Sequence, residues 1–185
     1  METVIFEDDY LPVGHHAMLE AYRAQAYGTG WRLCNETLPG LFVGPIESRR
    51  DVSLLKIDTV ISILQSHERD EPRYPPLPEG ITEHKYELDD SLYGVISFEF
   101  LWDIIMKIYD ALTRLKHRVL VHCAAGRSRS ASIMIAYFLA TGIDSTAADA
   151  LKRLRVSRPC VHPNDAFMTQ LTDMESRLHG LVVGL

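Results

Sequence analysis

The strongest constraint on the fold is the stretch from Val119 to Ser130, which reads Val-Leu-Val-His-Cys-Ala-Ala-Gly-Arg-Ser-Arg-Ser. Its first residues are apolar and β-branched, which predicts a short buried strand. Small residues around Gly126 then predict a tight loop. Residues 130–139 predict a helix that ends near Gly142, because glycine commonly follows the last turn of a helix.

The loop between this strand and this helix has the composition of an oxyanion site. Its backbone N–H groups can curl inward, and the N-terminus of the helix adds unpaired amides and its positive dipole end. Cys123 ends the strand, and Arg129 begins the helix, where its planar fork can take two oxygens of a phosphate. In that positive field a cysteine ionises below its free pKa of about 8.5 and becomes a nucleophile. The candidate phosphate-binding residues are Ala124, Ala125, Gly126, Arg127, Ser128 and Arg129.

The nonapeptide from His122 to Ser130 resembles the signature of the cysteine-dependent protein phosphatases. It matches the form His-Cys-x-Ala-Gly-x-Ser-Arg-Ser of their dual-specificity branch at each fixed position. The competing interpretation makes Cys123 a small hydrophobic residue that ends a core strand, because free cysteines are commonly buried. That interpretation leaves the two arginines and the glycine of the loop unexplained, so we favour the resemblance.

The resemblance implies an α/β fold in which a central, mostly parallel twisted sheet is flanked by helices. It also implies that Cys123 attacks the phosphorus and forms a cysteinyl-phosphate. Arg129 and the loop amides stabilise the charge on the phosphoryl oxygens. We expect the hydroxyl of Ser130 to hydrogen-bond the sulfur, and His122 to orient the loop and tune the thiol. The loop and the arginine supply the positive charge, so we expect neither a metal nor another cofactor.

Two further candidate residues, Asp89 and Asp90, precede the cysteine. A phosphatase of this type needs a carboxylic acid that protonates the departing oxygen and later, as a carboxylate, activates water. In the family this acid lies on a loop, and the preceding strand ends one residue before it. The sequence Tyr86-Glu-Leu-Asp-Asp fits that register with Asp90 as the general acid, and Asp89 is the alternative. Both residues could instead serve only to form a turn.

The remaining pattern predicts strands over 38–45, 59–64 and 83–88, and helices over 48–55, 97–117, 144–155 and 164–179. The helix over 97–117 buries one apolar stripe and leads into the Val119 strand, as a crossover between parallel strands does. The likeness to the family extends from Leu38 to Leu178. It includes a closing Arg-x-x-x-x-Pro-Asn-x-x-Phe-x-x-Gln-Leu motif that begins at Arg158. We predict an N-terminal extension over 1–30, a catalytic domain over 31–179 and a tail over 180–185.

Three features leave alternatives open. Residues 65–80 hold four prolines among charges and predict a long loop, which either borders the active site or is a spacer. Arg49 and Arg50 either help a phosphorylated substrate to dock or form an ordinary charged face. Cys160 is either a resolving thiol for oxidised Cys123 or an unrelated cysteine, because the sequence alone cannot place the two within disulfide reach.

Composition limits the classes of partner. The 185 residues suit one domain, and a net charge of −6 argues against a nucleic-acid-binding face. Three cysteines are too few for a disulfide framework and favour a reducing compartment. No apolar run approaches the length of about 20 residues that crosses a bilayer, and the acidic N-terminus is unlike a secretion signal. We therefore expect a cytoplasmic or nuclear monomer without nucleic-acid or membrane partners.

We expect a protein phosphatase that hydrolyses phosphotyrosine and phosphoserine or phosphothreonine in phosphorylated protein substrates. A phosphoinositide or inositol phosphate substrate is one alternative, because Arg127 adds a cation where lipid-directed relatives often carry a lysine. Their second lysine would follow the cysteine, where this chain has Ala124. The other alternative is a STYX-like pseudophosphatase that binds partners without turnover. Such relatives lack the nucleophile, which this chain keeps at Cys123.

Overall fold

The computed structural model describes residues 33–70 and 74–183, and the predicted extension over 1–30 lies outside these residues. Within the described part of the chain, five strands form one sheet in the order β1-β2-β5-β3-β4. The strands are β1 (Asn35–Leu38), β2 (Leu41–Gly44), β3 (Thr59–Ile63), β4 (Thr82–Tyr86) and β5 (Val119–His122).

The central part of the sheet is parallel, which confirms the predicted fold class. β5 lies between β2 and β3 and runs parallel to both, and β3 runs parallel to β4. The register sets Gly44 and Ser62 on either side of His122. Because parallel strands end at the same edge of a sheet, the segments that follow β2, β3 and β4 border the loop that follows β5.

The first predicted strand, over 38–45, is divided in the structure. β1 and β2 form an antiparallel hairpin, and Pro39 and Gly40 lie in its turn, with Gly40 at φ +80°. That conformation is readily available only to glycine. The Pro-Gly pair is therefore a turn between two strands. β1 was missed because its sequence, Asn-Glu-Thr-Leu, lacks the apolar run of a core strand.

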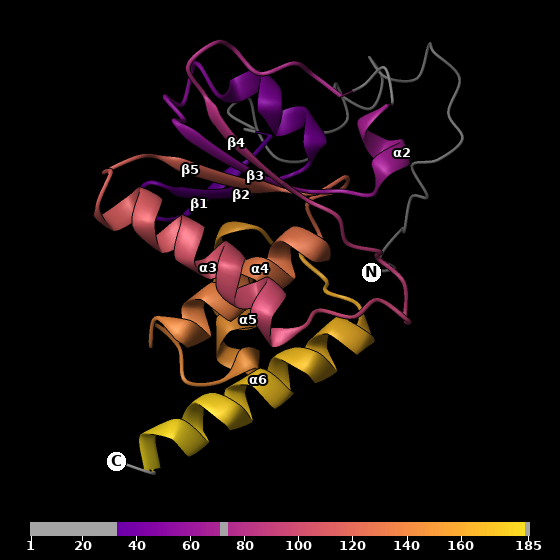
Figure 1. Cartoon of the computed structure of the whole chain (residues 1–185), viewed down its shortest axis with the longest axis vertical. Helices are drawn as coiled ribbons and strands as arrows, with labels where there is room; N and C mark the ends of the chain where they lie inside the picture. Colours follow the sequence, from indigo (N-terminus) through magenta and orange to yellow (C-terminus); the bar gives the residue numbers. More distant parts are fainter. Residues whose placement is uncertain (1–32, 71–73, 184–185) are drawn as a thin grey trace, which may run out of the picture. The chain divides into compact units, whose positions relative to one another are not determined.

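Four helices gather on one side of the sheet in Figure 1: α3 (Phe98–Thr113), α4 (Arg129–Ala140), α5 (Ala147–Ser157) and α6 (Asp165–Val183). Ser97 caps α3 by accepting a hydrogen bond from the N–H of Phe100, and Thr146 caps α5 in the same way. α6 continues past residue 179, where the pattern predicted its end. Among the described residues, no helix combines the length and the apolar character that crossing a membrane requires.

Two short helical segments differ from the sequence prediction. The pattern predicted a helix over 48–55, whereas the structure has a 3-10 helix, η1 (Ile46–Asp51), which starts directly after Pro45. Residues 65–80 were predicted to lack regular structure, but they contain α2 (Ser66–Arg69). A capping box at Gln65 and Glu68 starts this single turn.

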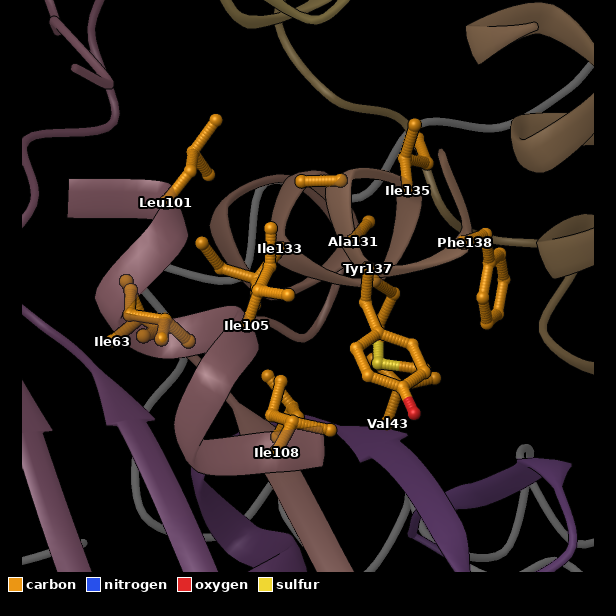
Figure 2. Packing of buried hydrophobic residues seen from close by; sticks show 14 of the residues in the cluster. Val43, Ile63, Leu101, Ile105, Ile108, Ala131, Ile133, Ile135, Tyr137 and Phe138 are labelled. Atoms are coloured by element: carbon orange, nitrogen blue, oxygen red, sulfur yellow. The ribbon is translucent and has the colours of Figure 1, made fainter. Parts of the chain in front are cut away.

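The core has two layers, one on each face of the sheet. The larger layer packs the sheet against α3 to α6, and Figure 2 shows Val43 and Ile63 of the sheet with Ile105 and Ile133 of the helices. The smaller layer, on the opposite face, packs the sheet against η1 and the residues after it; it comprises Cys34, Phe42, Val52, Leu55, Ile57, Val60 and Leu120. Every residue of α4 from Arg129 to Leu139 is buried. The helix that follows the predicted phosphate loop is thus held firmly in the core, since each buried large aliphatic side chain contributes roughly 1.5–3 kcal/mol.

Candidate active site

The loop between β5 and α4 is shaped by a close approach of backbone to backbone. Gly126 has φ +65°, and a Cβ atom there would overlap the backbone of Gly44 and Pro45. Only glycine meets both requirements. The N–H of Ile46 donates to the carbonyl of Ala124 over 3.1 Å, which ties the loop to the segment after β2.

Arg158 supports the same loop from the opposite side. It is 5% exposed, and its Nε donates to the carbonyl of Gly126 over 2.8 Å. Its Nη1 donates to Oδ1 of Asn35 over 2.8 Å, so it links the loop to β1. The N–H of His162 donates to the carbonyl of Arg127 over 2.9 Å. The sequence placed Arg158 in the closing motif but gave no sign that it reaches the loop.

The predicted nucleophile and its hydroxyl partner lie together at the base of the loop. Cys123 directly follows β5 and is 1% exposed. Its Sγ lies 3.2 Å from Oγ of Ser130, which is also buried in the first turn of α4. A hydroxyl at this distance can donate to a thiolate.

Arg129 is held by a glutamate that the sequence did not identify. Its Nη1 and Nη2 donate to the two carboxylate oxygens of Glu68, over 2.5 and 2.7 Å. Burial alone would lower the pKa of the guanidinium, but the ion pair with Glu68 raises it. Burial would raise the pKa of Glu68, but the hydrogen bonds from Arg129 and from the N–H of Gln65 lower it. The pair therefore stays ionised.

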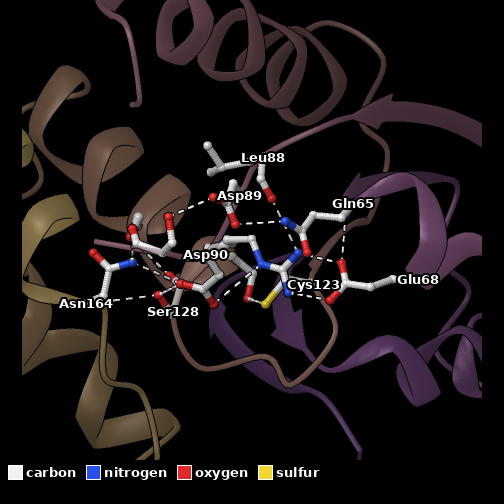
Figure 3. Close-up of polar contacts among 12 residues, drawn as sticks. Gln65, Glu68, Leu88, Asp89, Asp90, Cys123, Ser128 and Asn164 are labelled. Atoms are coloured by element: carbon white, nitrogen blue, oxygen red, sulfur yellow. Dashed lines mark hydrogen bonds and ion pairs between the residues drawn. The ribbon is translucent and has the colours of Figure 1, made fainter. Parts of the chain in front are cut away.

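The opposite edge of the Arg129 guanidinium remains available. Its Nε is buried without a hydrogen-bond partner among the described residues, and it lies 3.4 Å from Oδ2 of Asp90. An unsatisfied buried donor is costly unless a ligand completes it. Figure 3 shows Glu68 and Asp90 on opposite sides of Cys123 in this view. The Glu68 ion pair thus occupies the Nη edge, and the Nε edge beside Asp90 keeps a donor that can bind an oxyanion between Arg129 and the loop amides.

The structure brings Asp90, and not Asp89, to Arg129. Oδ1 of Asp90 accepts from Oγ of Ser128 over 2.6 Å and from Nδ2 of Asn164 over 3.0 Å. Asp89 is engaged elsewhere: its two oxygens accept from Gln65 and from Ser91, each over 2.7 Å. Only Asp90 is fixed at the loop.

Behind the loop, His122 is completely buried. Its Nε2 lies 2.8 Å from Oγ of Ser62 and 3.4 Å from Nη1 of Arg49. Burial and the adjacent Arg49 guanidinium lower the pKa of His122 to about 3, so the ring is neutral near pH 7. Arg49 is only 3% exposed, so the suggestion that it helps a substrate to dock is wrong; its neighbour Arg50 is exposed.

The remaining loop cation, Arg127, is exposed, and its Nε donates to the carbonyl of Cys160 over 3.3 Å. Cys34, Cys123 and Cys160 form no disulfide, and Cys160 is exposed whereas Cys123 is buried. Within residues 33–70 and 74–183, no cluster of three or more His, Cys, Asp or Glu side chains is arranged to hold a metal ion.

Two functional candidates, Glu68 and Arg158, were not predicted from the sequence. Glu68 did carry a local signal, because Gln65 and Glu68 have the spacing of a capping box. That signal could have predicted α2, but not the ion pair, since Arg129 lies far along the chain. Arg158 carried no such signal.

The sequence of this chain is similar to proteins of one known family. Residues 47–177 match the family model of the dual specificity phosphatase catalytic domain. The chain is 36% identical to Dual specificity protein phosphatase 22 of Homo sapiens over 141 residues. The aligned region covers 76% of this chain and 73% of that protein. It is 32% identical over 176 residues to Dual specificity protein phosphatase 26 of Rattus norvegicus, covering 91% of this chain and 81% of that protein.

Solved structures agree with this assignment. The human tyrosine phosphatase-like serine/threonine/tyrosine-interacting protein superposes with a TM-score of 0.69 at 28% identity, covering 80% of this chain and 98% of that one. DUSP15 superposes with a TM-score of 0.67 at 28% identity, covering 83% of this chain and 97% of that one. The chain therefore belongs to the dual specificity phosphatase family and is a cysteine-based protein phosphatase.

Proposed function

We propose that this protein hydrolyses phosphotyrosine and phosphoserine or phosphothreonine in protein substrates through a cysteinyl-phosphate on Cys123. One observation carries the proposal: the buried Nε of Arg129 has no hydrogen-bond partner among the described residues and lies 3.4 Å from Oδ2 of Asp90. A phosphoryl group in the loop 124–129 would satisfy this donor together with the loop amides.

In the first step, the Cys123 thiolate attacks the phosphorus, and the S–P bond forms as the P–O bond to the substrate breaks. Protonated Asp90 gives its proton to the departing oxygen, which leaves as an alcohol or a phenol. Arg129 and the loop amides stabilise the charge on the three equatorial oxygens. The hydrogen bonds from Ser128 and Asn164 hold Asp90 in place for this transfer.

In the second step, ionised Asp90 takes a proton from water, and the water oxygen attacks the phosphorus. The S–P bond breaks, its electron pair returns to sulfur, and inorganic phosphate leaves. Ser130, whose Oγ lies 3.2 Å from Sγ, can donate to the returning thiolate and ease its departure. His122, the residue directly before the nucleophile, orients the loop and tunes the thiol.

The side chains favour a protein substrate over an inositol phosphate. The one additional loop cation, Arg127, is bound to the carbonyl of Cys160, and Ala124 offers no charge. A net charge of −6 favours neither nucleic acid nor an anionic membrane as a partner. We propose that residues 31–179 form the catalytic domain and act as a monomer in the cytoplasm or nucleus, where thiols stay reduced.

The test is hydrolysis of a series of aryl phosphates that differ in leaving group. We expect Cys123→Ser to abolish turnover. Asp90→Asn should lower kcat by about 10²- to 10⁴-fold for poor leaving groups and far less for good ones, which need no acid. Asp89→Asn is the matched control and should remain close to the unmodified protein. If Asp89→Asn carries the leaving-group effect instead, the assignment of the acid fails. If the reduced protein binds a phosphopeptide without turnover, the pseudophosphatase alternative replaces the enzyme.

A further inference from the structure

A buried polar cluster lies behind the nucleophile, and the proposed chemistry makes no use of it. Its centre is Arg49 of η1, whose Nη1 donates to Oε1 of Glu83 over 2.5 Å and to Oγ of Ser62 over 3.3 Å. The same Nη1 lies 3.4 Å from Nε2 of His122, the residue before Cys123. A buried charge of this kind needs an anion and hydrogen bonds, and Glu83 and Ser62 supply them.

The proline-rich segment closes over this cluster. The Nε of Arg49 donates to the carbonyl of Pro75 over 2.6 Å, and its guanidinium lies 4.0 Å from the centre of the Tyr74 ring. The hydroxyl of Tyr74 donates to Oε1 of Glu83 over 2.8 Å. Further back along the same segment, Glu68 holds Arg129. The segment over 65–80 is therefore more than a spacer. In its described parts, Glu68 binds Arg129, and Tyr74 and Pro75 contact Arg49.

The charges around His122 favour its neutral form. Burial lowers the pKa of His122 most, and Arg49 from η1 and Arg129 from α4 lower it further; a backbone hydrogen bond with Cys123 and the carboxylate of Glu83 from β4 raise it. Glu83 is already neutralised by Arg49, so the two cations and the burial prevail. A neutral His122 adds no positive charge beside the sulfur, whereas the Arg129 guanidinium does. The reactivity of the nucleophile then does not vary with the titration of its neighbour.

We propose that Arg49 is a positioning residue for the phosphatase reaction: through Ser62 and Nε2 of His122 it holds the imidazole behind Cys123, and it links this contact to Tyr74 and Pro75. This inference rests on the proposed role of Cys123 as the nucleophile. Arg49 touches neither the substrate nor the reacting atoms, and it acts only through His122.

The experiment follows the ionisation of His122 by NMR of ¹⁵N-histidine-labelled protein between pH 5 and pH 8. In the unmodified protein, we expect no titration of His122 over this range. Arg49→Met leaves Glu83 facing His122 through Ser62 without its cation, so the pKa of His122 should rise and its titration should enter this pH range. The pH profile of kcat/KM should gain an inflection at the same midpoint.

Three further variants separate charge from packing. Arg49→Lys keeps the cation and should restore a neutral His122. The double variant Arg49→Met/Glu83→Gln removes both charges, and burial alone should again suppress the titration. Arg50→Met removes a cation from the adjacent, exposed position and should leave both readouts unchanged.

Coupling to the segment is tested with Tyr74→Ala, which opens one face of the guanidinium to water and weakens its field at His122. The His122 midpoint should rise less than in Arg49→Met. Tyr109→Ala, which removes a half-exposed tyrosine from α3, is the control.

The proposal fails if folded Arg49→Met keeps His122 neutral and its pH profile unshifted. It also fails if His122 titrates between pH 5 and pH 8 in the unmodified protein, an outcome that does not depend on whether any variant folds. If His122 shows no titration between pH 5 and pH 8 in Tyr74→Ala, as in the unmodified protein, the coupling to the segment is refuted. Absence of turnover would count against the proposed function alone, because the NMR titration does not need an active enzyme.

Discussion

Two arginines of this protein are almost equally buried and used in different ways. Arg129 is 4% exposed and Arg49 is 3% exposed, and each donates to a glutamate. Arg129 keeps its Nε without a hydrogen-bond partner among the described residues. The Nε of Arg49 donates to Pro75, and its guanidinium lies over the ring of Tyr74.

The difference shows that burial and charge do not by themselves mark a ligand-binding arginine. Both guanidinium groups are buried cations paired with a glutamate, and Arg129 also lies in an ion pair with Asp90. Of the two, Arg129 keeps an Nε donor that has no hydrogen-bond partner in the described part of the chain, as the proposed phosphate site requires, whereas the Nε of Arg49 donates to Pro75. The unsatisfied donor is therefore the more informative observation.

Replacing each arginine by lysine tests whether the two guanidinium groups really differ in their role in catalysis. Lysine keeps the charge but cannot present two parallel N–H groups. We expect Arg129→Lys to lower kcat/KM by on the order of 10³-fold, because a preorganised donor to the transition state is lost. Arg49→Lys should lower kcat/KM by less than about tenfold. Aryl phosphate hydrolysis measures both, with thermal unfolding as the check on folding, and equal losses would refute the distinction.

The glutamate partner of Arg49, Glu83, should contribute to the free energy of unfolding in a way that depends on pH. Burial would raise the pKa of Glu83, but hydrogen bonds from Arg49, Ser62 and Tyr74 lower it to about 2. Because this pKa is depressed on folding, Glu83 stabilises the protein fully above about pH 4.5, and the contribution is lost as the pH falls toward 2. It amounts to about 3 kcal/mol.

We therefore expect Glu83→Gln to be less stable than the unmodified protein at pH 7 and to lose less stability between pH 4.5 and pH 2. Urea unfolding at a series of pH values measures this. Glu79→Gln, at an exposed position, is the control and should follow the unmodified protein. Parallel pH curves for Glu83→Gln and the unmodified protein would contradict the assignment.

The glutamate partner of Arg129, Glu68, should affect kcat. Glu68→Gln keeps a hydrogen bond but weakens the hold on the guanidinium, so the Nε edge is presented less accurately. We expect kcat to fall about tenfold with a smaller change in KM, because misplacement costs the transition state more than the ground state. The matched control is Glu87→Gln, since Glu87 accepts from Ser66 at the exposed side of the same segment. A loss confined to KM would assign Glu68 to substrate binding instead.

Much of the site followed from local sequence. The strand, loop and helix around Cys123 have an unbroken pattern from Val119 to Ser130, and Gly126 adopts the conformation that its residue type allows. The favoured acid, Asp90, lies where a loop follows β4. These features depend on neighbours in the chain, so propensity and motif spacing can predict them.

The missed features depend on pairs that are distant in sequence. Arg129 meets Glu68 61 positions away, and Arg158 meets Asn35 123 positions away. The local patterns around Glu68 and Arg158, a capping box and the closing motif, do not tell which distant residue each side chain contacts. The sequence suggested that Arg49 belongs to a charged face, because Arg50 follows it. In the fold, Arg49 is buried and Arg50 is exposed. Contacts between side chains that are distant in sequence can be predicted only once the topology of the fold is known.

The close approach of Gly126 to Gly44 and Pro45 has a consequence for how the protein folds. The loop cannot take its final shape until β2 has docked beside β5, and these strands come from distant parts of the chain. Forming such a nonlocal contact is slow, because the intervening chain loses entropy before the contact stabilises it. Competence to bind phosphate should therefore appear late in refolding. In the native protein, the amide of Ile46, which donates to the carbonyl of Ala124, should exchange with solvent only when this contact between the loop and the segment after β2 opens.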